Sequence, residues 1–290
     1  MKKILVTGSS GQLGSELQEL ASRFPQYNFL FLTRHELSLD DKNALEKTVL
    51  ENRPDFVINC AAYTAVDKAE TEREQAFRIN ETAVGALASA CAKIGAKFIH
   101  ISTDYVFDDN RQTPFKEDDA VNPINVYGES KLAGEQAALQ NNPQSIVIRT
   151  SWVYSSYGKN FVKTMMRLMS EKQSISVVHD QWGSPTYAAD LAKAILRIID
   201  SREWKPGIYH FSNEGVISWF DFAKEIGSLI QTNCEILPTT TANFPTPAKR
   251  PAYSVMDKSK IQQQYKIALR PWKESLSKCI HKMQNSAAIK

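Results

Sequence analysis

The run Ile4-Leu5-Val6-Thr7-Gly8-Ser9-Ser10-Gly11-Gln12-Leu13-Gly14 decides the fold of this chain. Its apolar start predicts a buried strand, and Leu13, Leu17 and Leu20 then recur at the spacing of a helix. Glycine at the three turn positions allows a tight turn, lets backbone approach a diphosphate and permits close packing of the helix on the strand. The N-terminus of that helix offers free N–H groups and the positive end of its dipole to phosphates. We therefore expect a dinucleotide site at this turn.

Short apolar runs alternate with helical patterns through the first half of the chain. The expected strands cover 28–32, 56–59, 98–102 and 146–148, and the expected helices cover 45–50, 82–94 and 128–140. Strands that are apolar throughout and alternate with helices predict a parallel sheet covered on both faces. The expected fold class is therefore α/β, with a doubly wound parallel sheet of the Rossmann type.

The pattern loosens after about residue 152, which suggests a second lobe. We expect a dinucleotide-binding domain over 1–152, to which 175–200 returns. A smaller, partly interleaved substrate-binding lobe would then consist of 153–174 and 201–290. Ligands of parallel sheets bind at the carboxyl ends of the strands, so the cleft between the lobes is expected there.

Composition permits an ordinary globular enzyme and argues against several other classes. The 290 residues are 42% apolar and 23% charged, and a net charge of +3 is too small to indicate nucleic acid or membrane as a partner. The four cysteines have no spacing typical of a metal site, so reduced thiols are expected. Lys2-Lys3 leads into a short strand rather than a signal peptide, and no apolar run approaches the ~20 residues that span a bilayer. A cytoplasmic location is therefore expected.

Tyr127 and Lys131 are four residues apart and lie on one face of an expected helix. A free tyrosine has a pKa of about 10, and a nearby ammonium favours the phenolate. We expect Tyr127 to protonate a carbonyl that receives hydride, and Lys131 to lower the pKa of Tyr127 and bind the nicotinamide ribose. Thr103, at a strand end, would donate to the substrate oxygen or cap the following turn. The pattern alone is common by chance, and the glycine turn upstream makes it informative.

Thr33 and Arg34 follow the second expected strand, where cofactor preference is decided. An acidic residue there would accept hydrogen bonds from the adenosine ribose and favour NAD. A guanidinium suits a 2′-phosphate instead. We therefore expect NADPH to serve at least as well as NADH, unless Arg34 simply points into solvent.

Several further motifs occur in order along the chain and give it a family resemblance. They are Asn59-Cys60-Ala61-Ala62-Tyr63-Thr64, Ser102-Thr103-Asp104-Tyr105-Val106-Phe107, Asn125-Val126-Tyr127-Gly128-x-x-Lys131, Arg149-Thr150-Ser151-Trp152, Asp180-Gln181-x-Gly183-x-Pro185-Thr186 and Thr246-Pro247-Ala248-x-Arg250-Pro251. With the glycine turn, they resemble the extended short-chain dehydrogenase/reductases over nearly the whole chain. Within that family the resemblance is to the dTDP-4-dehydrorhamnose reductases.

The resemblance implies reduction of the 4-keto group of dTDP-4-dehydro-β-L-rhamnose by NADPH or NADH. The catalytic positions are Thr103, Tyr127 and Lys131. Substrate contacts fall on Thr103, Asp104, Tyr105 and Trp152, and Arg250 is a candidate for the diphosphate. Cofactor contacts fall on Gly8, Gly11, Gln12, Leu13, Gly14, Thr33, Arg34, Ser38, Leu39, Ala61, Ala62, Tyr63, Thr64, Tyr127 and Lys131.

Some expectations stay open at this point. Thr33 and Ser38 replace acidic residues common in the family, which puts any preference for NADH in doubt. Some members form homodimers helped by a structural Mg²⁺, and the sequence shows no clear ligand set for that ion. The alternatives are another sugar-nucleotide epimerase or dehydratase of the family, or a regulatory relative without catalysis. The two histidines of apolar strands, His100 and His210, are expected to be core residues.

Overall fold

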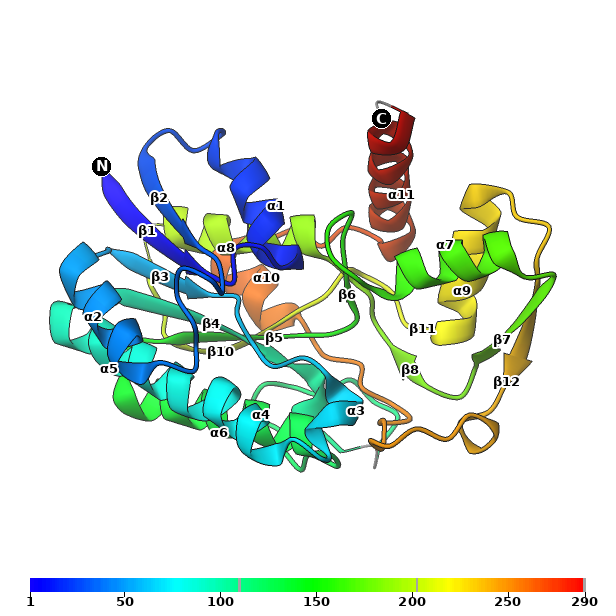
Figure 1. The fold of residues 1–290 in the computed structure, drawn as a ribbon, viewed down its shortest axis with the longest axis horizontal. Helices are drawn as coiled ribbons and strands as arrows, with labels where there is room; N and C mark the ends of the chain where they lie inside the picture. The colour runs from blue at the N-terminus through cyan, green and yellow to red at the C-terminus, as the bar shows by residue number, and fades with distance from the viewer. Residues whose placement is uncertain (109–110, 202, 289–290) are drawn as a thin grey trace.

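A six-stranded parallel sheet forms the larger layer of the molecule, in a computed structural model that describes residues 1–108, 111–201 and 203–288 (Figure 1). The strand order is β10-β5-β4-β3-β1-β2, and every neighbouring pair is parallel. The strands are β1 (Lys2–Thr7), β2 (Tyr27–Leu32), β3 (Phe56–Asn59), β4 (Lys97–Thr103), β5 (Ile146–Thr150) and β10 (Gly207–Phe211). The predicted doubly wound parallel sheet is thus confirmed.

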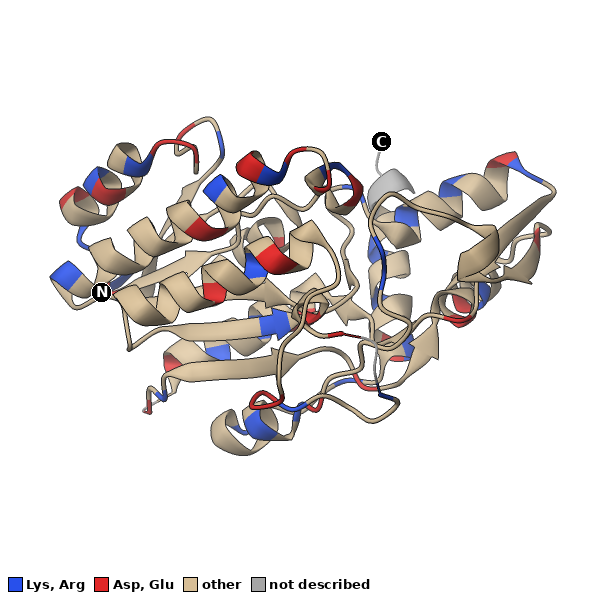
Figure 2. Cartoon of the chain, turned by 90° about the horizontal axis from the view of Figure 1, so that it is seen from below, with Lys and Arg blue, Asp and Glu red and all other residues tan. Residues whose placement is uncertain are grey.

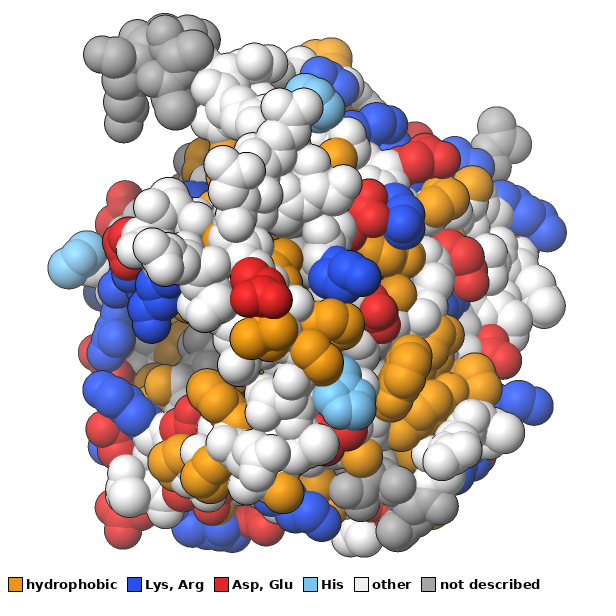
Figure 3. Space-filling model, turned by 90° about the vertical axis from the view of Figure 1, so that its right-hand side faces the viewer, with side chains coloured by type: hydrophobic (Ala, Val, Ile, Leu, Met, Phe, Trp, Pro, Cys, Tyr) orange, Lys and Arg blue, Asp and Glu red, His pale blue; other side chains and the backbone are white. Residues whose placement is uncertain are grey.

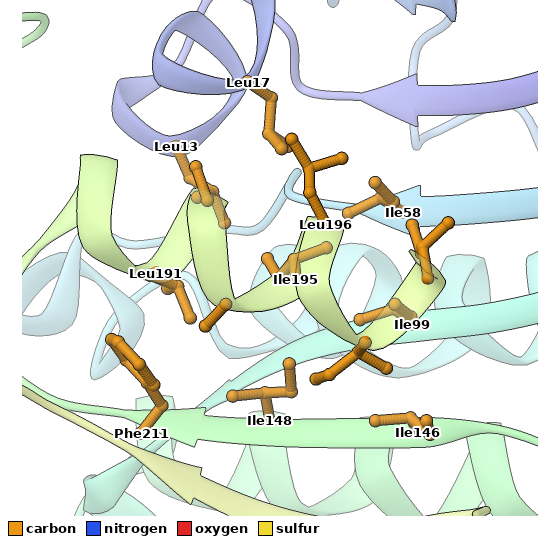
Figure 4. Close-up of a cluster of buried hydrophobic side chains, with 14 of the residues drawn as sticks. Leu13, Leu17, Ile58, Ile99, Ile146, Ile148, Leu191, Ile195, Leu196 and Phe211 are labelled. Carbon is orange, nitrogen blue, oxygen red and sulfur yellow. The ribbon is translucent and has the colours of Figure 1, made fainter. Parts of the chain in front are cut away.

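Helices cover both faces of this sheet because successive side chains of each strand point to opposite sides. Ile4 and Val6 of β1 face α1 (Gln12–Ala21) and α8 (Ala188–Asp200), as Figure 4 shows for the cluster between these helices and the sheet. Leu5, between them, faces the opposite cluster. The helices on that side are α2 (Lys42–Asn52), α5 (Ala83–Ile94) and α6 (Val126–Asn141).

The segment between β3 and β4 is irregular at its start and contains a π-helical turn. It contains α3 (Val66–Ala69) and α4 (Arg73–Phe77), followed by the π-helical turn η1 (Arg78–Thr82) that leads into α5. Gly134 of α6 faces this turn so closely that an added Cβ would meet Asn80 O at 1.9 Å. The close approach brings α6, the helix with the predicted tyrosine–lysine pair, near the sheet. The short helix η2 (Asp104–Val106) follows β4.

A smaller lobe packs beside the sheet around its own core. It contains three short strand pairs and the helices α7 (Phe161–Glu171), α9 (Trp219–Ile230) and α11 (Trp272–Ala288). The strand pairs are β6 (Val153–Tyr154) with β9 (Thr186–Tyr187), β8 (Trp182–Gly183) with β11 (Ile217–Ser218), and β7 (Ser174–Val178) with β12 (Glu235–Thr239). The remaining elements are η3 (Thr241–Asn243) and α10 (Ser259–Tyr265), and α10 packs on the main sheet.

Five elements lie on the other side of the expected division of the chain. β10 belongs to the main sheet and α10 packs on it, although 201–290 was expected in the smaller lobe. β7, β8 and β9 pair in the smaller lobe, although 175–200 was expected to return to the sheet. α8, which ends that segment, does pack on the sheet. The division into two lobes stays a proposal, with these five elements exchanged.

Charged and apolar side chains are distributed as in a globular protein. Figure 2 shows charged residues mainly on helices and loops, with the central strands almost free of them. Figure 3 shows hydrophobic side chains grouped among charged ones at the end formed by the smaller lobe. None of the helices in the described part of the chain has the length and apolar character needed to cross a membrane.

Candidate active site

A cleft of about 870 Å³ lies at the carboxyl ends of β1, β3, β4 and β5 and is lined from both lobes. This is the edge of the sheet where the sequence predicts ligand binding. The predicted residues that line it are Gly8, Gly11, Gln12, Leu13, Arg34, Leu39, Ala61, Ala62, Thr64, Thr103, Asp104, Tyr105, Tyr127, Lys131 and Trp152. The structure therefore brings the glycine turn and the tyrosine–lysine pair to one cavity.

The glycine turn has the geometry of a phosphate cradle. Gly8 has a φ of +65°, and a Cβ there would lie 2.7 Å from Ala61 N. A Cβ on Gly14 would lie 2.4 Å from Gly8 O, so only glycine permits this contact between helix and turn. Gly11 is the N-cap of α1 and no side chain caps the helix, so its first N–H groups are left for a ligand. The turn fits a dinucleotide diphosphate.

Tyr127 lies in the first turn of α6, edge-on to the ring of Tyr105 at 5.7 Å between centroids. Burial raises the pKa of Tyr127 to about 12, and a hydrogen bond with Thr103 opposes that rise. The expectation that Lys131 lowers the pKa of Tyr127 stays a prediction. The ammonium of Lys131 donates to Ile101 O at 2.7 Å and approaches His100 Nε2 at 3.3 Å.

Lys131 is only 1% exposed, and burial lowers its pKa to about 8, although the nearby Glu135 carboxylate opposes the shift. A buried ammonium near its titration point can exchange a proton at neutral pH. Its three N–H bonds exceed the two contacts described above, and Lys131 also lines the cleft. The remaining N–H bond is therefore available to a bound ligand.

Thr103 ends β4 with its hydroxyl shared between two neighbours. Its Oγ1 donates to Asp104 Oδ1 at 3.0 Å and accepts from Tyr105 N at 3.2 Å. The capping role that the sequence allowed for Thr103 is thus present, and the residue lines the cleft as well. Burial raises the pKa of Asp104 to about 6.

Five predicted residues do not line the cleft: Gly14, Thr33, Ser38, Tyr63 and Arg250. Thr33 bonds Glu36 through both its backbone N and its hydroxyl, each at 2.8 Å. Arg250 pairs with both carboxylate oxygens of Asp67 at 2.9 Å. A diphosphate would have to compete with that carboxylate, so the role of Arg250 stays a prediction.

Residues that sequence reasoning missed line the other side of the cleft. Trp219 stacks on Trp152 with ring centroids 3.6 Å apart, and Phe161 packs against Trp219 at 4.5 Å. Trp152 has a φ of +48°, which brings its ring against Gly183. Asp40 lines the cleft near Arg34 and bonds Arg78 at 2.9 Å. The spacing of Phe161 and Trp219 in the sequence does not relate them to Trp152, because these rings meet only when the smaller lobe packs on the sheet.

Side chains that could bind a metal ion are the last group of interest at the site. Among the residues that the structure describes, no three His, Cys, Asp or Glu side chains gather to hold a metal ion. The structural Mg²⁺ that the resemblance implied stays a prediction, and the described part of the chain offers no candidate site for it.

A parallel sheet, a glycine turn and a tyrosine–lysine pair at one cleft define a nicotinamide-dependent oxidoreductase of the extended short-chain dehydrogenase/reductase class. Comparison with known proteins narrows the class. The family model "RmlD substrate binding domain" matches residues 1–285. The chain therefore belongs to the RmlD family, and several of its curated relatives are named dTDP-4-dehydrorhamnose reductases.

Individual relatives agree with this assignment over nearly their full length. The dTDP-4-dehydrorhamnose reductase of Aggregatibacter actinomycetemcomitans is 41% identical over 286 residues, 95% of this chain and 97% of that protein. The Salmonella typhimurium enzyme of the same name is 40% identical over 301 residues, with 99% of each covered. The crystal structure of the Bacillus anthracis str. Ames reductase in complex with NADP superposes with a TM-score of 0.93 at 41% identity, covering 97% of this chain and 100% of that chain.

Proposed function

We propose that this chain reduces the 4-keto group of dTDP-4-dehydro-β-L-rhamnose to give dTDP-L-rhamnose, with NADPH as the preferred reductant. The observation that carries the proposal is one cleft lined by the glycine turn, Thr103, Tyr127 and Lys131 in a chain of the RmlD family. The B. anthracis relative, at 41% identity, has NADP in its crystal structure, which supports the choice of cofactor.

The residues of the chain divide the remaining work between proton transfer and positioning. The chemistry that NADPH supplies when bound is hydride transfer to the carbonyl carbon. Tyr127 donates a proton to the carbonyl oxygen as negative charge develops on it. Thr103, already within hydrogen-bond reach of Tyr127, orients that oxygen. Lys131 stabilises the phenolate left on Tyr127 and supplies an N–H bond to the cofactor ribose.

A stack of aromatic rings in the cleft supports the proposal that a deoxysugar is the substrate. Trp152, Trp219 and Phe161 form a stack on the side of the cleft that belongs to the smaller lobe. Apolar ring faces suit the C–H face and methyl group of a 6-deoxyhexose. Asp104 and Tyr105 lie beside Thr103 on the polar side. We propose that these residues bind the sugar and that Arg250 acts on the diphosphate only if Asp67 releases it.

The test is oxidation of NADPH and of NADH by the purified protein with dTDP-4-dehydro-β-L-rhamnose, followed by determination of product stereochemistry at C4. We expect stoichiometric oxidation and dTDP-L-rhamnose. An epimerase or dehydratase would instead retain nicotinamide after dialysis and turn over without consuming it. A regulatory relative would do neither.

Tyr127→Phe removes only the phenolic oxygen of the proposed acid. We expect turnover to fall by at least about two orders of magnitude, because general acid catalysis is worth that much. Binding of NADPH, measured by fluorescence, should persist. Tyr253→Phe, at a tyrosine that packs on Phe115 and does not line the cleft, is the matched control and should keep most of the activity. Full activity in Tyr127→Phe would contradict the assignment.

A further inference from the structure

A series of buried polar side chains leads from β1, the strand before the glycine turn, to Lys131. Thr7 Oγ1 lies 2.7 Å from Asn59 Oδ1, and Asn59 Nδ2 lies 3.1 Å from His100 Nδ1. His100 Nε2 then lies 3.3 Å from Lys131 Nζ. Asn59 and His100 are fully buried and Thr7 is 1% exposed. Three neighbouring strands, β1, β3 and β4, thus place one side chain each in a line behind the site.

The donor and acceptor roles of these side chains follow from the protonation state of Lys131. An ammonium has donors only, so Nε2 of His100 must offer a lone pair to it. Burial and the charge of Lys131 lower the pKa of His100 well below its usual value, so the ring is neutral and Nδ1 carries its proton. That proton needs an acceptor on Asn59. Turning the Asn59 amide by half a rotation places Oδ1 against Nδ1 and Nδ2 against Thr7 Oγ1, so the imidazole, the amide and the ammonium each have a partner.

In the orientation that the structure gives the Asn59 amide, the same series of side chains suits Lys131 as a neutral amine. Asn59 Nδ2 then donates to His100 Nδ1, which places the ring proton on Nε2, facing the lysine. Only a neutral amine accepts that proton. Rotation of one amide and exchange of one imidazole tautomer therefore accommodate both protonation states without exposing any group to water.

We propose that His100 is a positioning residue for the reaction: it holds Lys131 toward the cleft and supplies the lone pair that stabilises its ammonium, with Asn59 and Thr7 fixing the ring. This inference rests on the proposed role of Lys131 in catalysis. His100 does not line the cleft, so it acts through the lysine and not on the substrate.

The other charged and titratable groups near Lys131 do not replace this role. Glu135, one turn later on α6, is paired with Arg149 of β5 at 2.7 Å and accepts from Ser102 at 2.5 Å. Its carboxylate raises the pKa of Lys131 through space, and no hydrogen bond joins the two. Tyr127 and Asp104 face the site from α6 and η2. Among these side chains only His100 has a described contact with Nζ.

The experiment measures the titration of Lys131 directly in the ligand-free protein, by NMR of ¹³C-labelled lysine, with the signal assigned by its absence in Lys131→Met. In His100→Leu the ammonium loses its acceptor, so we expect Lys131 to titrate at least one pH unit lower than in wild type, a factor of about ten in proton affinity. His100→Gln, whose side chain oxygen can accept the same bond, should restore most of the shift. His210→Leu, a buried histidine of β10 that does not line the cleft, is the control and should leave Lys131 unchanged.

Activity gives the second readout. The basic limb of the kcat profile should move to lower pH in His100→Leu and return in His100→Gln, while KM for the sugar nucleotide changes little. If His100→Leu does not fold, His100→Met replaces it, since its flexible thioether adapts to the cavity without providing a strong acceptor. An unshifted Lys131 titration in a folded variant overturns the proposal. Because that titration needs neither substrate nor cofactor, it stands apart from failure of the proposed reaction.

Discussion

At the scale of single residues, the site keeps a lysine in an environment that disfavours its charge. Lys131 is buried among α6, β4 and His100, and its pKa is lowered from 10.5 to about 8. The folded state therefore binds this proton less tightly than the unfolded chain does. Below pH 8 both states are protonated and the unfavourable term is fully present, and it is relieved as pH rises from 8 to 10.5. The residue thus lowers stability in the pH range where it functions.

Lys131→Met should therefore raise the free energy of unfolding at pH 7 by about 1–3 kcal/mol, while abolishing activity. The lower value allows for the hydrogen bond that Ile101 O loses. Urea unfolding at pH 7 and near pH 10.5 measures the effect, and the gain should shrink at the higher pH. Lys47→Met, at an exposed lysine of α2, serves as the control. A loss of stability at pH 7 would contradict this account.

Arg34 is the residue on which the cofactor preference depends. Its side chain is 77% exposed, 3.8 Å from Asp40, and lines the cleft. Arg34→Ala should raise KM for NADPH about tenfold and leave KM for NADH nearly unchanged, because only NADPH has the 2′-phosphate. Steady-state kinetics with both cofactors measures this, and Arg23→Ala, at an exposed arginine after α1, is the control. An unchanged KM for NADPH would show that Arg34 points into solvent, and an equal rise in both KM values would contradict a contact with the 2′-phosphate.

At the scale of elements, the contact between α6 and the π-helical turn η1 positions the catalytic helix. Asn80 of η1 binds Tyr63 through both its amide atoms and donates to Ser130 Oγ at 2.9 Å. Gly134 allows the backbones to meet at this point. The π-helical turn thus connects the segment after β3, expected to bind the cofactor, to the helix of Tyr127 and Lys131.

Gly134→Ala should lower the free energy of unfolding by about 2 kcal/mol or more, because its Cβ would lie 1.9 Å from Asn80 O and the backbone must move. Gly85→Ala is the matched control, since its Cβ would meet Ala137 Cβ at an ordinary 3.4 Å across the α5–α6 interface. That substitution should be neutral or stabilising by helix propensity. Thermal unfolding of the two variants makes the comparison. Equal effects would mean that the close approach is not needed.

The sheet and the glycine turn could be predicted from the sequence, because those features are local. Apolar strands and the glycine turn are each contained in a short run of residues, and their order along the chain implies the sheet. The stacking of Trp219 on Trp152 could not be predicted, because α9 reaches the cleft only through packing of the smaller lobe. The same holds for β10, whose place in the main sheet depends on a return from that lobe. The contact between Lys131 of α6 and His100 of β4 likewise depends on how the helix packs on the sheet.

At the scale of the whole molecule, a partly buried ion pair joins the two lobes. Lys282 of α11 binds Glu16 of α1 at 2.9 Å and also contacts Glu19. Glu16 is 1% exposed and accepts from Ser155 of the smaller lobe at 2.6 Å. The C-terminal helix is thus fastened to the helix that begins at the phosphate cradle.

Lys282→Met should lower the free energy of unfolding by about 2 kcal/mol, because it leaves the Glu16 carboxylate buried without its cation. Glu16→Gln combined with Lys282→Met should be more stable than the sum of the single changes predicts. Chemical unfolding of the four proteins completes this double-mutant cycle. Strict additivity would mean that the pair does not couple the lobes.

β10 is the last strand of the main sheet to be synthesised, and this order has a consequence for the nascent protein. While a ribosome is still producing the residues after Thr150, β5 has no neighbour on its outer side, and all five of its residues are ones that the finished sheet buries. An open edge of a strand that the folded protein buries invites pairing with other nascent chains. The exposure ends only when Gly207–Phe211 has left the exit tunnel. Stalled translation between these points would therefore prolong the exposure of this strand edge.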